Sequence, residues 1–215
     1  MSRFSAALTR CGVCALALPT DLSPGLKTGP AICARCARQR PPLDGALAAV
    51  SYSFPWSTLI AHYKFGEQPA WAGFFAALLL DAPGVRPAFA DLEARDWVIP
   101  LPLSAARLQA RGFNQAWELA CALARQSRTR ARADPGLLLR VRDTRPQTQL
   151  KREARLANVR GAFQLDPLRV AALEGRRVLL VDDVMTSGAS MFAAAQALRD
   201  GGAAHVTAVV LARTQ

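Results

Sequence analysis

The sequence predicts an α/β protein, with a parallel sheet flanked by helices and preceded by a small module that contains four cysteines. Two observations carry this prediction. Strand-like and helix-like segments alternate from Ala46 to the end of the chain, as in sheets built from strand–helix–strand units. Four of the five cysteines lie at or before Cys36. A chain of 215 residues can bury one sizeable core beside a small appendage, so we expect two parts, residues 1–42 and residues 43–215.

The first part contains two C-x2-C pairs, Cys11 with Cys14 and Cys33 with Cys36, separated by residues 15–32. Two thiolates spaced in this way can hold one tetrahedral ion from the same side, and two such pairs complete a four-sulfur site. The intervening residues are rich in proline and glycine and cannot form a core by themselves. This zinc-ribbon spacing predicts a structural zinc ion. Two disulfides, or four unrelated thiols, are the alternative interpretations.

The second part begins with alternating patterns in residues 46–126. Pro55 suits the first turn of a helix that follows an initial strand. Residues 115–126 place four apolar residues at helical spacing: Ala116, Leu119, Ala120 and Leu123. The expected elements are a strand at 46–54, helices at 55–65 and 69–80, a short strand at 96–103 interrupted by two prolines, a loop, and a helix at about 115–126.

A stronger strand–helix–strand unit ends the chain, after possible short strands at 137–141 and 161–165. The continuous apolar run at 178–181 is typical of a buried parallel strand. The following helix has an apolar face at Met191, Ala194, Ala195 and Leu198. Two glycines end this helix, and residues 205–212 form the last strand.

The charge is strongly positive and unevenly distributed. The formal net charge is +11, and residues 107–160 hold 13 Lys and Arg against 4 Asp and Glu. Such a region favours a polyanionic partner, such as phosphate, pyrophosphate or nucleic acid, although basic surfaces also serve solubility. The apolar run at 70–80 is too short for a membrane span, and the amino-terminal apolar stretch is too brief for a signal peptide. We expect no membrane insertion and a cytoplasmic protein.

Two adjacent carboxylates, Asp182 and Asp183, follow the apolar strand, at the place where open α/β sheets bind ligands. The sequence MTSGAS then leads into a helix. The backbone N–H groups there can converge on an anion at the helix N-terminus, and a glycine allows close approach. The residues expected to form this phosphate loop are Thr186, Ser187, Gly188, Ala189 and Ser190.

Carboxylates beside a phosphate loop need hydroxyl donors or a divalent cation as partners, because they would repel the phosphate itself. A ribose 5-phosphate meets both demands: its hydroxyls donate to the acids and its phosphate occupies the loop. The alternative is that these residues are a helix cap and a surface acidic pair. A nucleotide-binding P-loop is excluded, because no G-x4-G-K-[ST] pattern is present.

The stretch VLLVDDVMTSGAS resembles the phosphoribosyl pyrophosphate motif of type I phosphoribosyltransferases. Three further blocks, YKFGE (63–67), VIPLPLSAARLQARGFNQAWELA (98–120) and TRPQTQLKREARLANVRGAF (144–163), stand in an order similar to that of the ComF/GntX family. Members of this family carry a four-cysteine module ahead of the same domain. The resemblance implies the type I phosphoribosyltransferase fold, phosphoribosyl pyrophosphate as ligand, and magnesium with it.

The resemblance also implies roles for individual residues. Asp182 and Asp183 would be the catalytic acids of a transfer in which a nitrogen nucleophile displaces pyrophosphate. Arg107 and Arg111 would form the pyrophosphate loop. Further substrate-binding residues would be Lys64, together with Arg145 and Gln149 of a mobile loop. For each of these basic or polar side chains, a solvated surface position is the alternative.

The family resemblance further implies a role in competence and DNA uptake. The alternative function is a non-catalytic adaptor that binds single-stranded DNA and competence proteins and retains the sugar-phosphate pocket. The basic region and the cysteine module are compatible with that function. No segment that would recognise a particular acceptor base is identifiable.

Overall fold

The computed structural model describes residues 8–19, 31–66, 68–142 and 161–215. At its centre lies a five-stranded sheet in which all neighbouring strands are parallel, which confirms the predicted parallel sheet. In spatial order its strands are β1 (Gly45–Ser51), β7 (His205–Arg213), β6 (Arg177–Met185), β2 (Trp97–Pro100) and β3 (Arg132–Ala133). Two short strands, β4 (Leu138–Arg140) and β5 (Phe163–Leu165), form a separate antiparallel pair.

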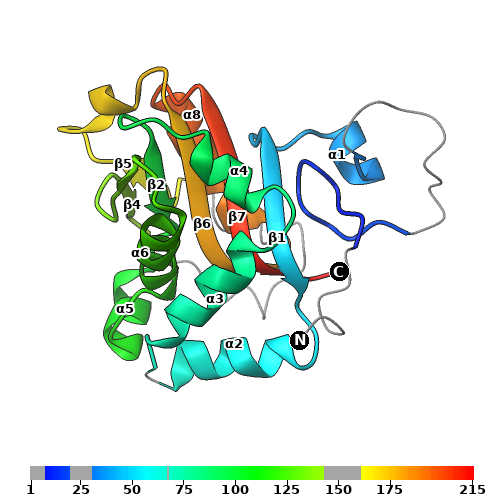
Figure 1. Ribbon diagram of the computed structural model, residues 1–215. Helices are drawn as coiled ribbons and strands as arrows, with labels where there is room; N and C mark the ends of the chain where they lie inside the picture. Colours follow the sequence, from blue (N-terminus) through cyan, green and yellow to red (C-terminus); the bar gives the residue numbers. More distant parts are fainter. Residues whose placement is uncertain (1–7, 20–30, 67, 143–160) are drawn as a thin grey trace.

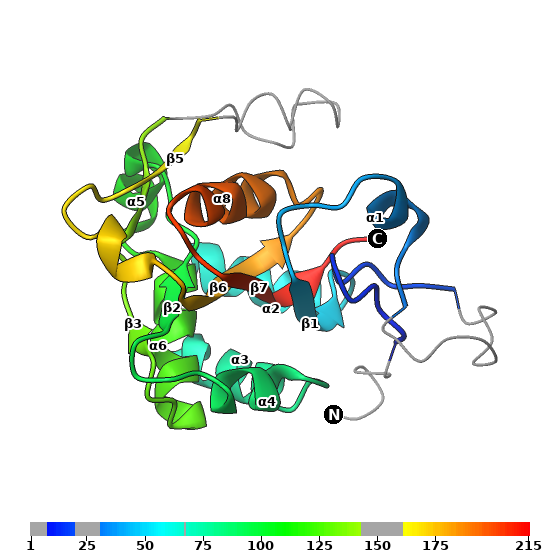
Figure 2. The same ribbon diagram turned by 90° about the horizontal axis from the view of Figure 1, so that it is seen from above.

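Helices cover both faces of the sheet (Figures 1 and 2). α3 (Trp71–Leu80), α4 (Val85–Ala90) and α6 (Gln115–Ser127) lie on one face, and α8 (Ala189–Asp200) lies on the other. The remaining helical segments are α1 (Ala34–Arg38), α2 (Trp56–Phe65), α5 (Ala105–Arg111) and the 3-10 turn η3 (Val170–Leu173). This arrangement requires strands that are apolar on both sides.

The strand β6 shows how the apolar run meets that requirement. Leu180 packs into the core on the α8 side, whereas Leu179 and Val181 pack into the core beneath α3 and α6. The predicted helix faces are also confirmed: every residue named for them is buried. They are Ala116, Leu119, Ala120 and Leu123 on α6, and Met191, Ala194, Ala195 and Leu198 on α8.

The predicted strand at 178–181 was too short. β6 runs on to Met185, because its backbone keeps pairing with β7, where Asp182 lies opposite Val210 and Met185 opposite Arg213. The acidic pair therefore belongs to the last residues of the strand and does not follow its end. Backbone hydrogen bonds to a long neighbouring strand can extend a strand beyond its apolar residues.

The predicted loop after β2 contains the helix α5, which sequence analysis missed. Ser104 precedes the helix, and Gly112 ends it in a left-handed conformation with a φ of 79°. None of the residues within α5 is buried, so the helix lacks the apolar periodicity from which it could have been predicted. Arg107 and Arg111 thus project from a helix instead of a loop.

The apolar run at 70–80 forms the buried helix α3, as expected. Phe75, Ala76 and Leu79 are fully buried against α6 and the sheet. In the part of the chain that the structure describes, no helix is long and apolar enough to cross a membrane.

The cysteine module packs against the edge strand β1 (Figure 1). Ala46 of β1 donates its N–H to the carbonyl oxygen of Gly12 at 2.9 Å, so the module covers an otherwise open strand edge. All four of its cysteines join the same buried cluster as the α8 side of the sheet. The division of the chain at residue 42 stays a prediction.

Candidate functional site

A cleft of about 410 Å³ opens where β2 and β6 end and α8 begins. It brings together most of the residues that the sequence singled out: Lys64, Arg107, Arg111, Asp182, Asp183, Thr186, Gly188, Ala189 and Ser190. Ser187 belongs to the same loop but is not among the lining residues. Arg145 and Gln149 lie outside the described residues.

The two acids that line this cleft lie in different surroundings. Asp183 is 2% exposed, whereas Asp182 is partly exposed. The Asp183 N–H donates to Asp182 Oδ1 at 2.8 Å, and the Val184 N–H donates to Asp183 Oδ1 at 2.7 Å. Burial and the neighbouring Asp183 carboxylate raise the pKa of Asp182 well above its usual range. A hydroxyl donor or a cation bound at Asp182 would relieve this repulsion.

Lys64 supplies positive charge to the acidic pair. It lies in the last turn of α2, and its Nζ is 3.0 Å from Asp183 Oδ2. The Lys64 side chain is 20% exposed, so the ion pair is largely shielded from water. The electrostatic effect of Lys64 also reaches Asp182, whose pKa it lowers against the larger effect of burial.

The loop after β6 turns sharply into α8 at Gly188. Its φ of 83° lies in the left-handed region that favours glycine, and a Cβ added there would stand 2.5 Å from Phe192 Cζ. The Ala189 N–H donates to Ser187 Oγ at 3.3 Å. Gly188 is the N-cap residue of α8, and it has no side chain that could cap the first N–H groups of the helix. The positive end of a twelve-residue helix therefore faces the cleft that Gly188 and Ser190 line.

Arginines also line the cleft. Arg111 Nη1 donates to the side-chain oxygen of Gln115, and its guanidinium lies over the Phe65 ring, 5.0 Å from the centroid. Burial, followed by repulsion from Arg107, lowers the pKa of Arg111, while the two aspartates oppose this effect. Among the described residues, no hydrogen-bond acceptor reaches the buried Arg111 Nε. A buried donor without an acceptor is suited to an incoming anion.

Sequence analysis missed four further aromatic or polar lining residues: Tyr52, Phe65, Gln115 and Arg140. Tyr52 directly follows β1, so its place after a strand end was a signal that could have been used. Gln115 and Arg140 had no such signal. Gln115 starts α6 and holds Arg111, and Arg140 belongs to the small β4–β5 pair.

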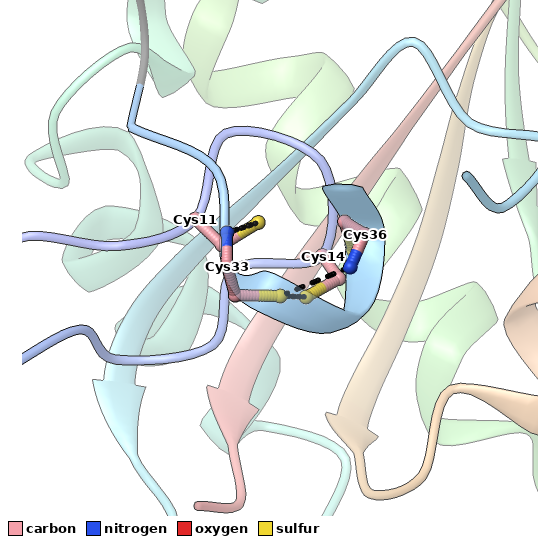
Figure 3. A group of neighbouring side chains, drawn as sticks. All are labelled: Cys11, Cys14, Cys33 and Cys36. Atoms are coloured by element: carbon pink, nitrogen blue, oxygen red, sulfur yellow. Dashed lines mark hydrogen bonds between the residues drawn. The ribbon is translucent and has the colours of Figure 1, made fainter. Parts of the chain in front are cut away.

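The four cysteines form a second, separate cluster (Figure 3). All are buried, and their sulfur atoms lie within 4.8 Å of one another. Cys14 Sγ and Cys33 Sγ are 3.7 Å apart, close to the separation of about 3.8 Å that a tetrahedral four-thiolate zinc site requires from its Zn–S bonds of about 2.3 Å. The geometry fits a bound metal ion.

Hydrogen bonding prepares one of these thiols for ligation. Burial tends to raise the pKa of Cys11, but the backbone N–H groups of Cys33, Val13 and Cys14 outweigh it and bring the pKa to about 7. Burial raises the pKa of Cys14 and of Cys36. A cation at the centre would favour the thiolate form of all four, because thiolates are the metal-binding species.

Comparison with known proteins places this architecture in a family. The family model of the phosphoribosyl transferase domain matches residues 138–215, which include the acidic pair and the loop after it. The DNA utilization protein YhgH of Escherichia coli O6:H1 is 33% identical over 210 residues, which cover 95% of this chain and 90% of that protein. Competence protein F of Haemophilus influenzae is 32% identical over 184 residues, 84% of this chain and 78% of that protein. The chain belongs to the ComF family.

Another ComF relative is Competence protein ComFC of Bacillus subtilis, which is 34% identical over 118 residues, 54% of this chain and 44% of that protein. The matched domain, the parallel sheet between helices and the amino-terminal cysteine cluster confirm the predicted phosphoribosyltransferase fold with a four-cysteine module. In this ComF protein the segment from Met185 to Ser190, apart from Ser187, lines the cleft, and Arg35 and Arg213 donate hydrogen bonds to its backbone carbonyl oxygens.

Proposed function

We propose that this ComF protein binds phosphoribosyl pyrophosphate in the cleft and acts as a phosphoribosyltransferase. The observation that carries the proposal is the joining, in one cleft, of the acidic pair, the helix N-terminus after Gly188 and the arginines of α5. The 5-phosphate would occupy the loop, the ribose hydroxyls would donate to Asp182 and Asp183, and the pyrophosphate would extend toward Arg107 and Arg111.

The transfer would follow from this placement. A nitrogen nucleophile attacks C1 of the ribose as the bond between C1 and the pyrophosphate oxygen breaks, and the bonding electrons leave with pyrophosphate. Arg107 and Arg111 stabilise the charge that develops on the leaving group. A magnesium ion bound together with the ligand near Asp182 and Asp183 would neutralise part of the same charge. Asp182 and Asp183 offset the positive charge that develops on the ribose.

Lys64 has a supporting part in this proposal, because it balances Asp183 before the ligand arrives. Arg145 and Gln149 would close over the ligand and exclude water, as mobile loops do in related enzymes. The cysteine cluster would hold a structural zinc ion, since four buried thiols at tetrahedral spacing leave no position open for a substrate. Four ligating thiols suit a reducing compartment, so the proposed location is the cytoplasm.

The test is calorimetric titration of the protein with phosphoribosyl pyrophosphate and magnesium. The double substitution Asp182→Asn and Asp183→Asn should abolish binding. Each amide loses the negative charge and one of the two oxygens that accept from the ribose hydroxyls, and its NH2 group donates instead. The matched control is Asp81→Asn with Asp91→Asn, two exposed acids that follow the last residues of α3 and α4, and this variant should bind as the wild type does. Full binding by the first pair would contradict the proposal. If the wild type binds the ligand, an assay of pyrophosphate release with candidate bases and amines would identify the acceptor.

We also propose a second function, binding of single-stranded DNA. Five arginines within residues 125–142 are exposed, and the acid among those residues, Asp134, is buried in an ion pair with Arg169. The exposed arginines are Arg125, Arg128, Arg130, Arg132 and Arg142. Arg132 also pairs with Asp134, with its Nε 3.6 Å from Asp134 Oδ2, so the charge of the other four supports contacts with phosphates of a nucleic-acid backbone. The names of the relatives, a DNA utilization protein and competence proteins, agree with a partner of this kind.

Titration with single-stranded DNA at several salt concentrations tests this second function. Replacing Arg128 and Arg130 by Ala should weaken binding and reduce the salt dependence by about one phosphate contact per arginine. The acid pair variant should keep its DNA affinity, because its residues lie in the cleft. Binding that is independent of salt would contradict an electrostatic contact.

A further inference from the structure

A buried arginine at the end of the sheet joins the cysteine cluster to the phosphate loop. Arg213, the last residue of β7, is 4% exposed. Its Nε donates to the carbonyl oxygen of Cys14 at 2.9 Å, and its Nη1 donates to the carbonyl oxygen of Met185 at 3.0 Å and also to that of Thr186. One guanidinium therefore spans a metal-ligating residue and the start of the loop.

A second arginine makes the same connection from the module side. Arg35 lies on α1 between Cys33 and Cys36, and its Nη1 donates to the carbonyl oxygen of Ser187 at 3.2 Å. Its guanidinium also lies over the Phe192 ring, 5.7 Å from the centroid. That ring occupies the space beside Gly188 that a Cβ would fill. The position of α1 therefore affects the loop in two ways, through the hydrogen bond from Arg35 to Ser187 and through the packing of Arg35 on the Phe192 ring.

These bonds set the direction of the loop's donors. In a planar trans peptide the C=O and the following N–H point in opposite directions. Arg213 draws the Thr186 carbonyl toward the module, so the N–H of Ser187 points the other way. Arg35 does the same for the peptide between Ser187 and Gly188. The N–H groups of Ser187 and Gly188 are therefore directed away from the module, as binding of an anion in the cleft requires.

We infer that Arg35 and Arg213 are positioning residues that couple the metal-loaded cysteine cluster to the phosphate loop. The inference rests on the proposed binding of a ribose phosphate. A metal ion fixes Cys14, Cys33 and Cys36 relative to one another, and with them the Cys14 carbonyl and the helix α1 that carries Arg35. Sugar-phosphate binding and metal retention thereby stabilise the same arrangement. By linkage, each must strengthen the other by the same factor.

The experiment measures this coupling in both directions with the full-length, zinc-loaded protein. Ribose 5-phosphate affinity is measured by calorimetry, and zinc retention is measured at equilibrium against a chromophoric chelator, with and without ribose 5-phosphate. Arg35→Met should weaken ribose 5-phosphate binding about tenfold, the effect of losing one hydrogen bond from a charged donor. It should also remove the gain in zinc retention that the sugar phosphate gives to the wild type. Arg213→Met should weaken ribose 5-phosphate binding further and should also remove the gain in zinc retention.

The matched control is Arg38→Met, which removes the same charge from the same helix at an exposed position. It should behave as the wild type in both measurements. If Arg35→Met also behaves as the wild type, or if the sugar phosphate leaves wild-type zinc retention unchanged, the inference is wrong. Arg35 is only partly buried, so its variant decides the matter even if Arg213→Met does not fold.

Hydrogen exchange separates this inference from the proposed function. Amides of residues 186–190 should exchange faster in Arg35→Met than in Arg38→Met, with no ligand present. Failure of the wild type to bind ribose 5-phosphate would contradict the proposed function, while this comparison would still decide whether Arg35 orders the loop. Equal exchange in the two variants would overturn the inference, whether or not the ligand binds.

Discussion

Lys64 Nζ lies 3.0 Å from Asp183 Oδ2, which joins the last turn of α2 to the end of β6. The Asp183 side chain is 3% exposed, so its negative charge depends on this lysine for compensation. The sequence left Lys64 undecided between a ligand-binding residue and a surface residue. In the cleft Lys64 contacts Asp183, and this makes it a structural counter-charge as well as a lining residue.

Lys64→Met should lower the free energy of unfolding by about 1–3 kcal/mol at pH 7, because it leaves a buried carboxylate without its partner. The expected loss is smaller than that for a fully buried ion pair, since the Lys64 side chain is 20% exposed. Urea unfolding measures the change. As a control, Arg86→Met breaks the exposed pair with Asp81 and should cost no more than about 0.5 kcal/mol. Equal losses in the two variants would show that Asp183 does not depend on Lys64.

Asp182→Asn should stabilise the protein at neutral pH, by on the order of 1 kcal/mol, at the expense of ligand binding. Burial and Asp183 raise the pKa of Asp182 in the folded state, so the folded state holds this proton more tightly than the unfolded state does. The stability that this group contributes is complete below the unfolded pKa of about 3.9 and is lost as the pH rises through the folded pKa.

Urea unfolding of both proteins between pH 4 and pH 8 checks this expectation. The two stabilities should differ least at the acid end, and the variant should gain on the wild type as the pH rises. Asp200→Asn, at the distant end of α8, serves as the control and should show no such divergence. A wild type that gains stability over Asp182→Asn with rising pH would contradict the sign of the pKa shift.

The sequence predicted the fold well where local pattern and tertiary packing agree. The apolar run at 178–181 and the helical face from Met191 to Leu198 each correspond to a buried element. The sequence predicted poorly the features that depend on a contact with a residue distant in the chain. β6 is extended by pairing with β7, and the role of Arg213 depends on Cys14, which stands 199 positions earlier. No local pattern records such contacts, so only the folded structure reveals them.

Metal analysis should find about one zinc ion per chain, because the four thiols form a single closed site. Cys14→Ser should lose the ion and lower the midpoint of thermal unfolding, since the module joins the buried cluster of the sheet. Cys121→Ser is the matched control, because this thiol lies outside the cluster, and it should retain the metal. A chain that holds no metal when all five thiols are reduced would refute the zinc assignment.

Gly188→Ala should lower the free energy of unfolding by about 2–4 kcal/mol and abolish ribose 5-phosphate binding. The new Cβ would need a left-handed conformation, at about 1–2 kcal/mol, and would meet the Phe192 ring at 2.5 Å, which forces repacking beside the phosphate loop. Gly175→Ala separates the two costs, because Gly175 has a φ of 68° but no atom within 4 Å of its added Cβ. Gly175→Ala should lose only the stability that the left-handed conformation costs and should keep its ligand affinity. Urea unfolding measures the stability and calorimetry the affinity. If the two alanine variants were equally stable, Phe192 would move aside without cost, and the close packing of the loop against α8 would have no part in holding the phosphate.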